Sequence, residues 1–370
     1  MSYEFTLRIS QRIRKSPFFD ATIRWGASEF TVYNHMMMPF CYESYEADYW
    51  KLVSNVTLWD VACERQIEIT GPDALQLAEY MTPRDVSKCK IGQCQYALIT
   101  AEDGGIINDP VLLRLGEQHF WFSLADSDAL LYAKGIAQGL GLDVTIKEPD
   151  VSPLAIQGPN NLPLMEALFG DWIKQLGFFR FRETELDGIP LIVARSGWSK
   201  QGGFELYLRD GMYGDQLWEK IMEVGKPYDL APASPNPIER IEGGLLSYGS
   251  DMTIENNPFE LHLSKYCHLD KKADFIGREA LLRIKAEGAK RYLVGLEIQG
   301  EEFPACENHW PVYRQNLPCG MVTSAIHSPR LKKNIALSVL SAEYAFLGSK
   351  LEVDTPVGKM NAKVTSIPFS

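Results

Sequence analysis

The 370-residue sequence contains none of the short motifs that mark the common cofactor and nucleophile sites. It has no Walker loop and no GxGxxG after a strand, so nucleotide, nicotinamide and flavin cofactors have no sequence support. No GxSxG or SxxK indicates a hydrolase nucleophile. The six histidines form no HExxH, and His262 and His268 beside Cys267 lack the spacing of a metal site. We therefore expect neither a metal ion nor a dinucleotide cofactor.

Long apolar runs, cysteine pairs and an excess of positive charge are also missing. No apolar run approaches the length of a membrane span, and no apolar block near the N-terminus is typical of a signal peptide. The seven scattered cysteines include no CxxC, which favours free thiols in a reducing compartment. A formal net charge of −11 argues against nucleic acid or an anionic membrane as a partner. We expect a cytoplasmic protein, a monomer or homodimer, that binds small molecules.

Length and pattern indicate more than one domain. A chain of 370 residues exceeds what one compact core holds, so two or three domains are expected. Strand-like runs with glycine turns are interspersed with helical patterns, which indicates an α+β protein. These runs are Gln66–Ile69, Gln95–Thr100, Ile106–Leu115 and His119–Leu124, and the helical patterns are Ser127–Gly139, Leu162–Phe169 and Met212–Val224. Short strands alone follow, so we predict a core of residues 1–288 and a β domain of residues 289–370.

The segment around Glu205 is the most informative. Residues Leu191–Ala194 form an apolar strand, and a second strand, Phe204–Leu208, follows a glycine turn. Alternation places the apolar residues of the second strand on one face and Glu205 and Tyr207 on the other. A carboxylate beside an aromatic ring suits a flat heterocycle with two parallel N–H donors. The alternative is an ordinary hairpin with a solvent-facing Glu205.

Asn108-Asp109 interrupts the apolar strand that follows a turn at Gly104-Gly105. A carboxylate there is costly unless something pairs with it. Pro110 cannot donate a hydrogen bond to a strand ladder, which predicts an edge or bulge. Asp109 either caps a turn or pairs with Arg114, or it faces a cavity and supports a reacting nitrogen.

Two further sets of residues combine polar and apolar character. The segment Ile238–Ser247 has a helical apolar stripe, with Arg240 and Glu242 pointing elsewhere and with Gly243-Gly244, which predicts close packing or a close ligand. The alternative for the two charged residues is a surface ion pair.

Aromatic residues around three consecutive methionines, Met36, Met37 and Met38, form the other set. Core filling is one interpretation. The other is that Tyr33, His35 and Trp198 surround a small methylated cation, whose charge suits aromatic faces.

Taken in order, these segments resemble the aminomethyltransferase family, which includes the glycine-cleavage T-protein, over nearly the whole chain. The matching segments are Asn55–Val61, Asn108-Asp109, Ile156–Pro159, Gly203–Glu205, Arg240-x-Glu242, Gly277–Leu281, Ser328-Pro329 and Asn334–Leu337. Within the family, TVYNHM, YESYEADY, WDVACERQ, MTPRD, DVSPLAIQGP and LLSYGSDMTIENNP look like the tetrahydrofolate-dependent dimethylsulfoniopropionate demethylases.

The resemblance implies a three-domain cloverleaf with a C-terminal β-barrel and tetrahydrofolate in a central hole. It places Glu205 on the pterin amide and amino groups, with Tyr207 beside it, and Asp109 near the reacting pterin nitrogen as the catalytic residue. Tyr96, Arg240 and Glu242 would complete the folate site. From their aromatic chemistry, and not from the resemblance, we expect Tyr33, His35 and Trp198 to bind the sulfonium substrate. The implied reaction transfers a methyl group from the sulfonium to tetrahydrofolate, giving 5-methyltetrahydrofolate and a thioether.

The sequence departs from the family pattern at two places. T-proteins carry Gly-Glu-Asp where this chain has Ser199–Gly202, which disfavours aminomethyl transfer from a lipoyl arm. The demethylase branch tends to carry Tyr at the position of Trp198. Three alternatives follow: demethylation of another onium compound such as betaine, the lipoyl-dependent aminomethyltransferase, and a non-catalytic folate-binding assembly factor. The last is disfavoured because its cysteine motif is absent.

Overall fold

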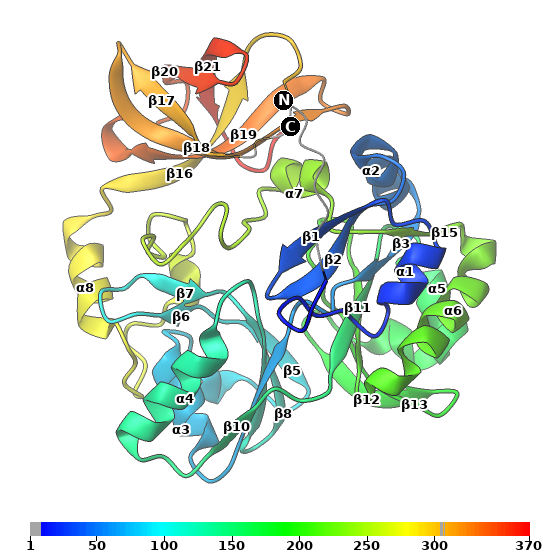
Figure 1. Cartoon of the computed structure of the whole chain (residues 1–370). Helices are drawn as coiled ribbons and strands as arrows, with labels where there is room; N and C mark the ends of the chain where they lie inside the picture. Colours follow the sequence, from blue (N-terminus) through cyan, green and yellow to red (C-terminus); the bar gives the residue numbers. More distant parts are fainter. Residues whose placement is uncertain (1–8, 304–305, 307) are drawn as a thin grey trace.

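The computed structural model describes residues 9–303, 306 and 308–370, which form three lobes around a common centre (Figure 1). One lobe is built on a six-stranded sheet, the second on a five-stranded sheet, and the third is a closed β-barrel. The α+β class and the cloverleaf with a C-terminal barrel are therefore confirmed. Within the described residues, no helix is both long and apolar enough to cross a membrane.

The first lobe is a sheet covered by helices. Its strand order is β12 (Phe181–Leu186), β13 (Ile189–Ala194), β14 (Gly203–Leu208), β11 (Ser152–Gln157), β3 (Val56–Asp60) and β15 (Leu230–Ala233). Only the β15–β3 pair is parallel. The apolar face of β14 packs on α5 (Asn161–Phe169) and α6 (Gly214–Gly225), with Trp218 of α6 fully buried. This packing leaves the opposite face of β14 for the site.

The second lobe is inserted between β3 and β11 of the first. Its strand order is β10 (Thr145–Lys147), β4 (Gln66–Thr70), β9 (His119–Ser123), β8 (Val111–Gly116) and β5 (Gln93–Tyr96). Helices α3 (Ala74–Met81) and α4 (Ala129–Leu140) pack on it. A separate pair, β6 (Ile99–Thr100) and β7 (Ile106–Asn108), closes at the predicted glycine turn. The insertion gives the central region walls from two different sheets.

Two strands that the sequence predicts as continuous are interrupted. The run Ile106–Leu115 breaks into β7 and β8 at Asp109-Pro110, and Gln95–Thr100 breaks into β5 and β6. The proline has no N–H to continue a ladder, so the chain changes sheet at this dipeptide. The predicted edge or bulge at Asp109 is therefore a boundary between two sheets.

The third lobe is a barrel in the order β16 (Arg291–Ile298), β19 (Lys333–Ser341), β18 (Leu317–Ser328), β17 (Trp310–Arg314), β20 (Lys350–Thr355) and β21 (Gly358–Thr365). Helix α8 (Arg278–Glu287) precedes it. The hairpin β1 (Glu29–Tyr33) and β2 (Met36–Cys41) and the helices α1 (Phe19–Arg24) and α2 (Tyr45–Ser54) belong to the N-terminal segment. In Figure 1 the barrel sits across from the other two lobes, with α7 beneath it.

Helix α7 (Pro237–Gly243) is shorter than the predicted segment Ile238–Ser247. The Asn236 side chain caps its N-terminus, and Gly244 ends it with a left-handed φ of 66°. A Cβ on Gly244 would lie 1.9 Å from Ile367, so close packing against the chain's C-terminal segment requires glycine there. Ile238 and Ile241 pack with barrel residues such as Leu337. The predicted apolar stripe therefore docks the helix on the barrel.

Candidate active site

Glu205 lies buried on β14 and is held by two hydroxyl groups. It is 5% exposed, so the solvent-facing alternative is wrong. Tyr207 Oη donates to Glu205 Oε2 at 2.9 Å, and Ser196 Oγ donates to the same oxygen at 2.5 Å. Burial raises the pKa of the Glu205 carboxyl, and the two hydroxyl donors oppose this rise. Glu205 Oε1 has no hydrogen-bond partner among the described residues and is available to a ligand.

Tyr207 extends from the first sheet into a cluster that joins the two sheets. Its ring centroid lies 6.3 Å from that of Trp121 on β9, and Cys94 of β5 belongs to the same cluster. The two faces of β14 alternate as the sequence predicts. The structure adds that one face packs into the core of the first lobe and the other against the second lobe. This junction brings the face that carries Glu205 to the second sheet.

Asp109 has the same arrangement of one fixed and one free oxygen. Tyr96 Oη donates to Asp109 Oδ2 at 2.8 Å, whereas Asp109 Oδ1 is buried without a partner. Burial raises the pKa of Asp109 to about 7, and the Tyr96 hydrogen bond opposes the rise. Arg114 instead bonds main-chain carbonyls, including that of Cys89, so the pairing of Asp109 with Arg114 is wrong. A buried acceptor without a donor indicates a ligand position.

A third carboxyl group, that of Glu64, lies within electrostatic reach of these two. Burial raises the pKa of Glu64 well above its ordinary value, and the charges of Glu205 and Asp109 raise it further. Sequence reasoning missed Glu64 because it lies in a turn after β3, where no periodicity singles it out. The only available signal was the acidic residue directly after the apolar stretch that ends at Cys63.

The central region therefore holds three buried carboxyl groups without a basic partner among the described residues. Among the described residues, no Lys or Arg forms an ion pair or hydrogen bond with the carboxylates of Glu64, Asp109 or Glu205. The phenols of Tyr33, Tyr96 and Tyr248 lie close enough to Asp109 that its charge contributes to raising their pKa values, after burial. A buried carboxylate without a cation is costly, so a positively charged or multiply donating ligand is the natural partner.

Ser196 belongs to a loop that is packed tightly on Gln157. A Cβ on Gly197 or on Gly203 would come within 2.0 or 2.5 Å of the Gln157 amide nitrogen, so both positions need glycine. Gln157 Oε1 accepts from Ser199 Oγ at 2.7 Å, and Glu239 of α7 accepts from the Lys200 N–H at 2.7 Å. The stretch that departs from the T-protein pattern is thus fixed to both β11 and α7.

A pocket of about 460 Å³ borders this loop. Its lining includes Ser196, which bonds Glu205, and Arg195 and Phe178 at the outer side. Trp198 lies half-buried in the same loop, between Gly197 and Ser199. The structure therefore places Trp198 on the loop that supports Glu205.

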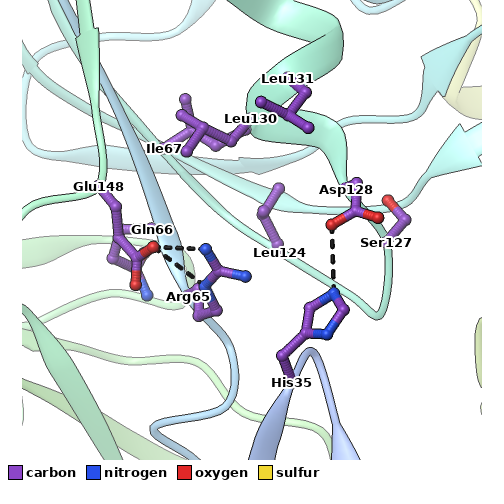
Figure 2. Close-up of a pocket in the computed structure, with 10 residues that line it drawn as sticks. All are labelled: His35, Arg65, Gln66, Ile67, Leu124, Ser127, Asp128, Leu130, Leu131 and Glu148. Carbon is purple, nitrogen blue, oxygen red and sulfur yellow. Dashed lines mark hydrogen bonds and ion pairs between the residues drawn. The ribbon is translucent and has the colours of Figure 1, made fainter. Parts of the chain in front are cut away.

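The other two predicted substrate residues lie at the β1–β2 turn, Tyr33 at the end of β1 and His35 within the turn, and they face different surroundings. Tyr33 is half-buried, packs on the first core and lies near Asp109. His35 is exposed at the turn, with a φ of 62°, and its Nε2 lies 3.2 Å from Asp128 Oδ1. His35 lines a pocket of about 300 Å³. Figure 2 shows that the lining also includes Arg65, which pairs with Glu148. Tyr33 therefore joins the central carboxylates, whereas His35 borders a separate pocket.

The methionines on β2 fill the core. Met36 and Met37 are each 7% exposed. Their burial supports the core-filling interpretation for this stretch.

Arg240 and Glu242 have partners other than each other. Arg240 donates to Asp251 Oδ2 at 2.6 Å and to Ser324 Oγ at 2.7 Å. Glu242 accepts from Tyr49 Oη at 2.9 Å and from Arg330 at 2.6 Å, and its residue is 3% exposed. The surface ion pair considered from the sequence is therefore wrong. Both residues connect α7 with neighbouring elements, including barrel strand β18.

Comparison with known proteins identifies the family. Residues 18–271 match the family model "GCVT N-terminal domain", and residues 291–370 match "Glycine cleavage T-protein C-terminal barrel domain". A dimethylsulfoniopropionate demethylase of Ruegeria pomeroyi is 44% identical over 94% of this chain and 95% of its own length. An aminomethyltransferase of Bacillus cytotoxicus is 29% identical over 96% of this chain and 98% of its own.

The fold has a solved counterpart as well. The crystal structure of the glycine cleavage system aminomethyltransferase T from Bartonella henselae covers 97% of this chain and 98% of its own, with a TM-score of 0.86 and 24% identity. All but one of the segments that suggested the resemblance lie within the two matched ranges; Gly277–Leu281 lies between them. The chain belongs to the glycine-cleavage T-protein family, with the N-terminal and C-terminal barrel domains of that family.

Proposed function

We propose that the protein transfers a methyl group from a sulfonium, dimethylsulfoniopropionate, to tetrahydrofolate. The products are 5-methyltetrahydrofolate and the thioether 3-methylthiopropionate. One observation carries this proposal: Glu205 and Asp109 each have one oxygen fixed by a tyrosine and the other free, in a region without a paired cation. The identity of 44% to a protein named for this demethylation supports the choice of substrate.

The Glu205 side suits the pterin of the folate. The pterin ring offers an N–H and an amino group on one edge, and a carboxylate accepts such paired donors with charge-assisted strength. Tyr207 and Ser196 fix the plane of the carboxylate through one oxygen, which leaves the other to the ligand. We propose Tyr207 and Tyr96 as supports of the two carboxylates in folate binding.

The Asp109 side suits the reacting centre. In the reaction the N5–CH₃ bond forms, the S–CH₃ bond breaks with its electron pair going to sulfur, and N5 then loses a proton. Asp109 stabilises the positive charge that moves from sulfur to N5, and its pKa of about 7 lets it accept that proton near neutral pH. The neutral thioether leaves without protonation, so no acid is needed.

The remaining predicted residues take supporting roles in this proposal. Tyr33 and Trp198 offer aromatic faces to the sulfonium, and His35 borders the neighbouring pocket. Arg240 and Glu242 contribute to folate binding indirectly. Their side chains are already paired, and these pairs fix the position of α7. We place the activity in the cytoplasm and in sulfur metabolism, without nucleic acid or membrane, and in a monomer or homodimer.

The decisive experiment supplies tetrahydrofolate and a panel of methylated onium compounds to the purified protein. Mass spectrometry of the folate should show 5-methyltetrahydrofolate with dimethylsulfoniopropionate and little with betaine. If 5-methyltetrahydrofolate forms with betaine and with no sulfonium, the methyl donor is a quaternary ammonium compound instead. Ammonia release with an aminomethylated lipoyl carrier, and no methylated folate with any onium, would identify the aminomethyltransferase instead.

A further inference from the structure

The guanidinium of Arg84 donates no hydrogen bond to any side chain or carbonyl of the described residues. The residue follows α3 and is half-buried, and its Nε is fully buried without a hydrogen-bond partner. The nearby carboxylate of Asp85 is taken by Lys88 at 2.7 Å and by Ser87 at 2.5 Å. The Arg84 side chain lies over the ring of Tyr266, whose centroid lies 5.4 Å from Cζ.

The backbone on both sides of this guanidinium is fixed. The carbonyl of Arg84 accepts from the buried Lys271 ammonium at 3.0 Å, which also bonds Glu79 and the Thr82 carbonyl. The next N–H, that of Asp85, donates to His268 Nδ1 at 2.9 Å. Arg84 therefore extends from a rigid support, and little conformational entropy is lost when it binds a ligand.

A second cation shares the same aromatic ring. Lys265 Nζ lies 5.0 Å from the centroid of Tyr266, and the described residues provide no carboxylate for it. Both cations lie against Tyr266 without a carboxylate partner among the described residues, so a bound anion would neutralise charge that the protein leaves unpaired. A planar guanidinium beside an ammonium suits a carboxylate, because the guanidinium can donate two parallel hydrogen bonds.

This cationic pair lies one ring away from the acidic centre. Tyr266 and Tyr96 meet edge to face with centroids 4.8 Å apart, and Tyr96 donates to Asp109. A ligand that reaches both places carries a positive or proton-donating part at Asp109 and a carboxylate at its other end. Both proposed ligands have this form: the sulfonium donor is a zwitterion, and folate has a glutamate opposite its pterin.

We propose that Arg84, assisted by Lys265 and oriented by Tyr266, is a carboxylate subsite of the active centre. This inference rests on the proposed function for the nature of its ligands. The shared chemistry is a carboxylate, which belongs either to the methyl donor or to the folate glutamate.

Four ligands separate these two sources. The KM values of the Arg84→Gln variant and of wild type are compared for dimethylsulfoniopropionate and for trimethylsulfonium, which lacks the carboxylate. Tetrahydrofolate and a tetrahydropterin without the aminobenzoylglutamate are compared by calorimetric Kd. Loss of a charged hydrogen bond predicts roughly tenfold or greater weakening for the ligand whose carboxylate Arg84 holds, and little change for its truncated partner. If only dimethylsulfoniopropionate binds more weakly, Arg84 holds the carboxylate of the methyl donor. If only tetrahydrofolate binds more weakly, Arg84 holds the folate glutamate.

Further variants guard against loss of fold. Arg84→Lys keeps the charge without the planar fork and should weaken binding less than Arg84→Gln. Arg182→Gln is the matched control, because Arg182 also lies over an aromatic ring, that of Trp172 at 4.6 Å, on the exposed edge strand β12. Equal weakening of full and truncated ligands, or no weakening of any, overturns the subsite. If none of the sulfonium compounds lets the wild-type protein methylate folate, the proposed function fails. The calorimetric comparison of tetrahydrofolate with the truncated tetrahydropterin alone then decides the subsite.

Discussion

Tyr207 donates a hydrogen bond of 2.9 Å to the carboxylate of Glu205, two residues earlier on the same strand. Side chains two apart on a strand point to the same face, so this contact needs no long-range folding event. It occupies Oε2 together with Ser196 and leaves Oε1 free. A ligand therefore meets a carboxylate that is already oriented.

Replacing Glu205 by Gln should weaken folate binding. The loss of a charged partner costs about 1.5–3 kcal/mol, or roughly tenfold or more in Kd. Calorimetry with tetrahydrofolate measures the effect. Glu183→Gln serves as the control, because Glu183 lies exposed on the edge strand of the same sheet and forms a surface ion pair with Arg209. Unchanged folate affinity in Glu205→Gln would remove this residue from the pterin site.

Asp109→Asn should lower kcat while the Kd for folate changes little. The substitution keeps the shape and the Tyr96 contact but removes the charge that stabilises positive N5 in the transition state. Single-turnover rates and calorimetric Kd separate the two effects. A variant that turns over at the wild-type rate would show that Asp109 is structural.

The pKa of Asp109 also predicts the pH dependence of stability. Its folded value of about 7 lies above the ordinary 3.8, so folding favours the protonated form. The stabilisation is complete below the ordinary value and is lost as the pH rises through about 7. In urea unfolding of the ligand-free proteins, the free energy of unfolding should fall less with rising pH in Asp109→Asn than in wild type. Binding of a cationic donor favours the carboxylate, so proton release should accompany it near neutral pH. Identical pH profiles for the two proteins would contradict the assignment.

Trp198→Leu should raise the KM for the sulfonium by about tenfold or more. Leucine keeps apolar area but loses the aromatic face, and a desolvated cation–π contact contributes up to about 2 kcal/mol or more. The neutral thioether product should bind almost as well as to wild type, because it has no charge to lose. Equal weakening of both ligands would mean that Trp198 only fills space.

Glu242→Gln should lower the free energy of unfolding. The buried carboxylate accepts from Tyr49, Ser328 and Arg330, and weakening charged hydrogen bonds costs about 1.5–3 kcal/mol. Urea denaturation measures the change, and Glu297→Gln, at an exposed pair with Lys333 on the barrel, is the control. Unchanged stability together with weakened folate binding would instead indicate direct contact with folate.

The parts of the site that depend on local pattern were predictable from the sequence. Alternation on Phe204–Leu208 predicts the shared face of Glu205 and Tyr207, and Pro110 predicts the interruption at Asp109. The cloverleaf and its barrel followed from the resemblance of ordered segments. The division at residue 289 stays a prediction, as do the roles of the site residues.

Contacts between distant elements could not be predicted in this way. Glu64 lies in a turn that has no periodicity, and the barrel partners of Arg240 and Glu242 are 84 and 88 residues away in the chain. The position of His35 depends on a left-handed turn whose two central residues, Asn34 and His35, are not glycine. Each depends on how the lobes meet, which a local pattern does not contain.

The insertion of the second lobe between two neighbouring strands has a consequence for protein engineering. Asp60 at the end of β3 faces Leu154 of β11 across one ladder, so the insert leaves and re-enters the first sheet at adjacent positions. A short linker can therefore replace the whole cassette without rerouting the sheet. The shortened protein would keep Glu205, the proposed pterin anchor, and lack Asp109, the residue proposed beside the reacting nitrogen, so the contribution of Glu205 could be measured without Asp109.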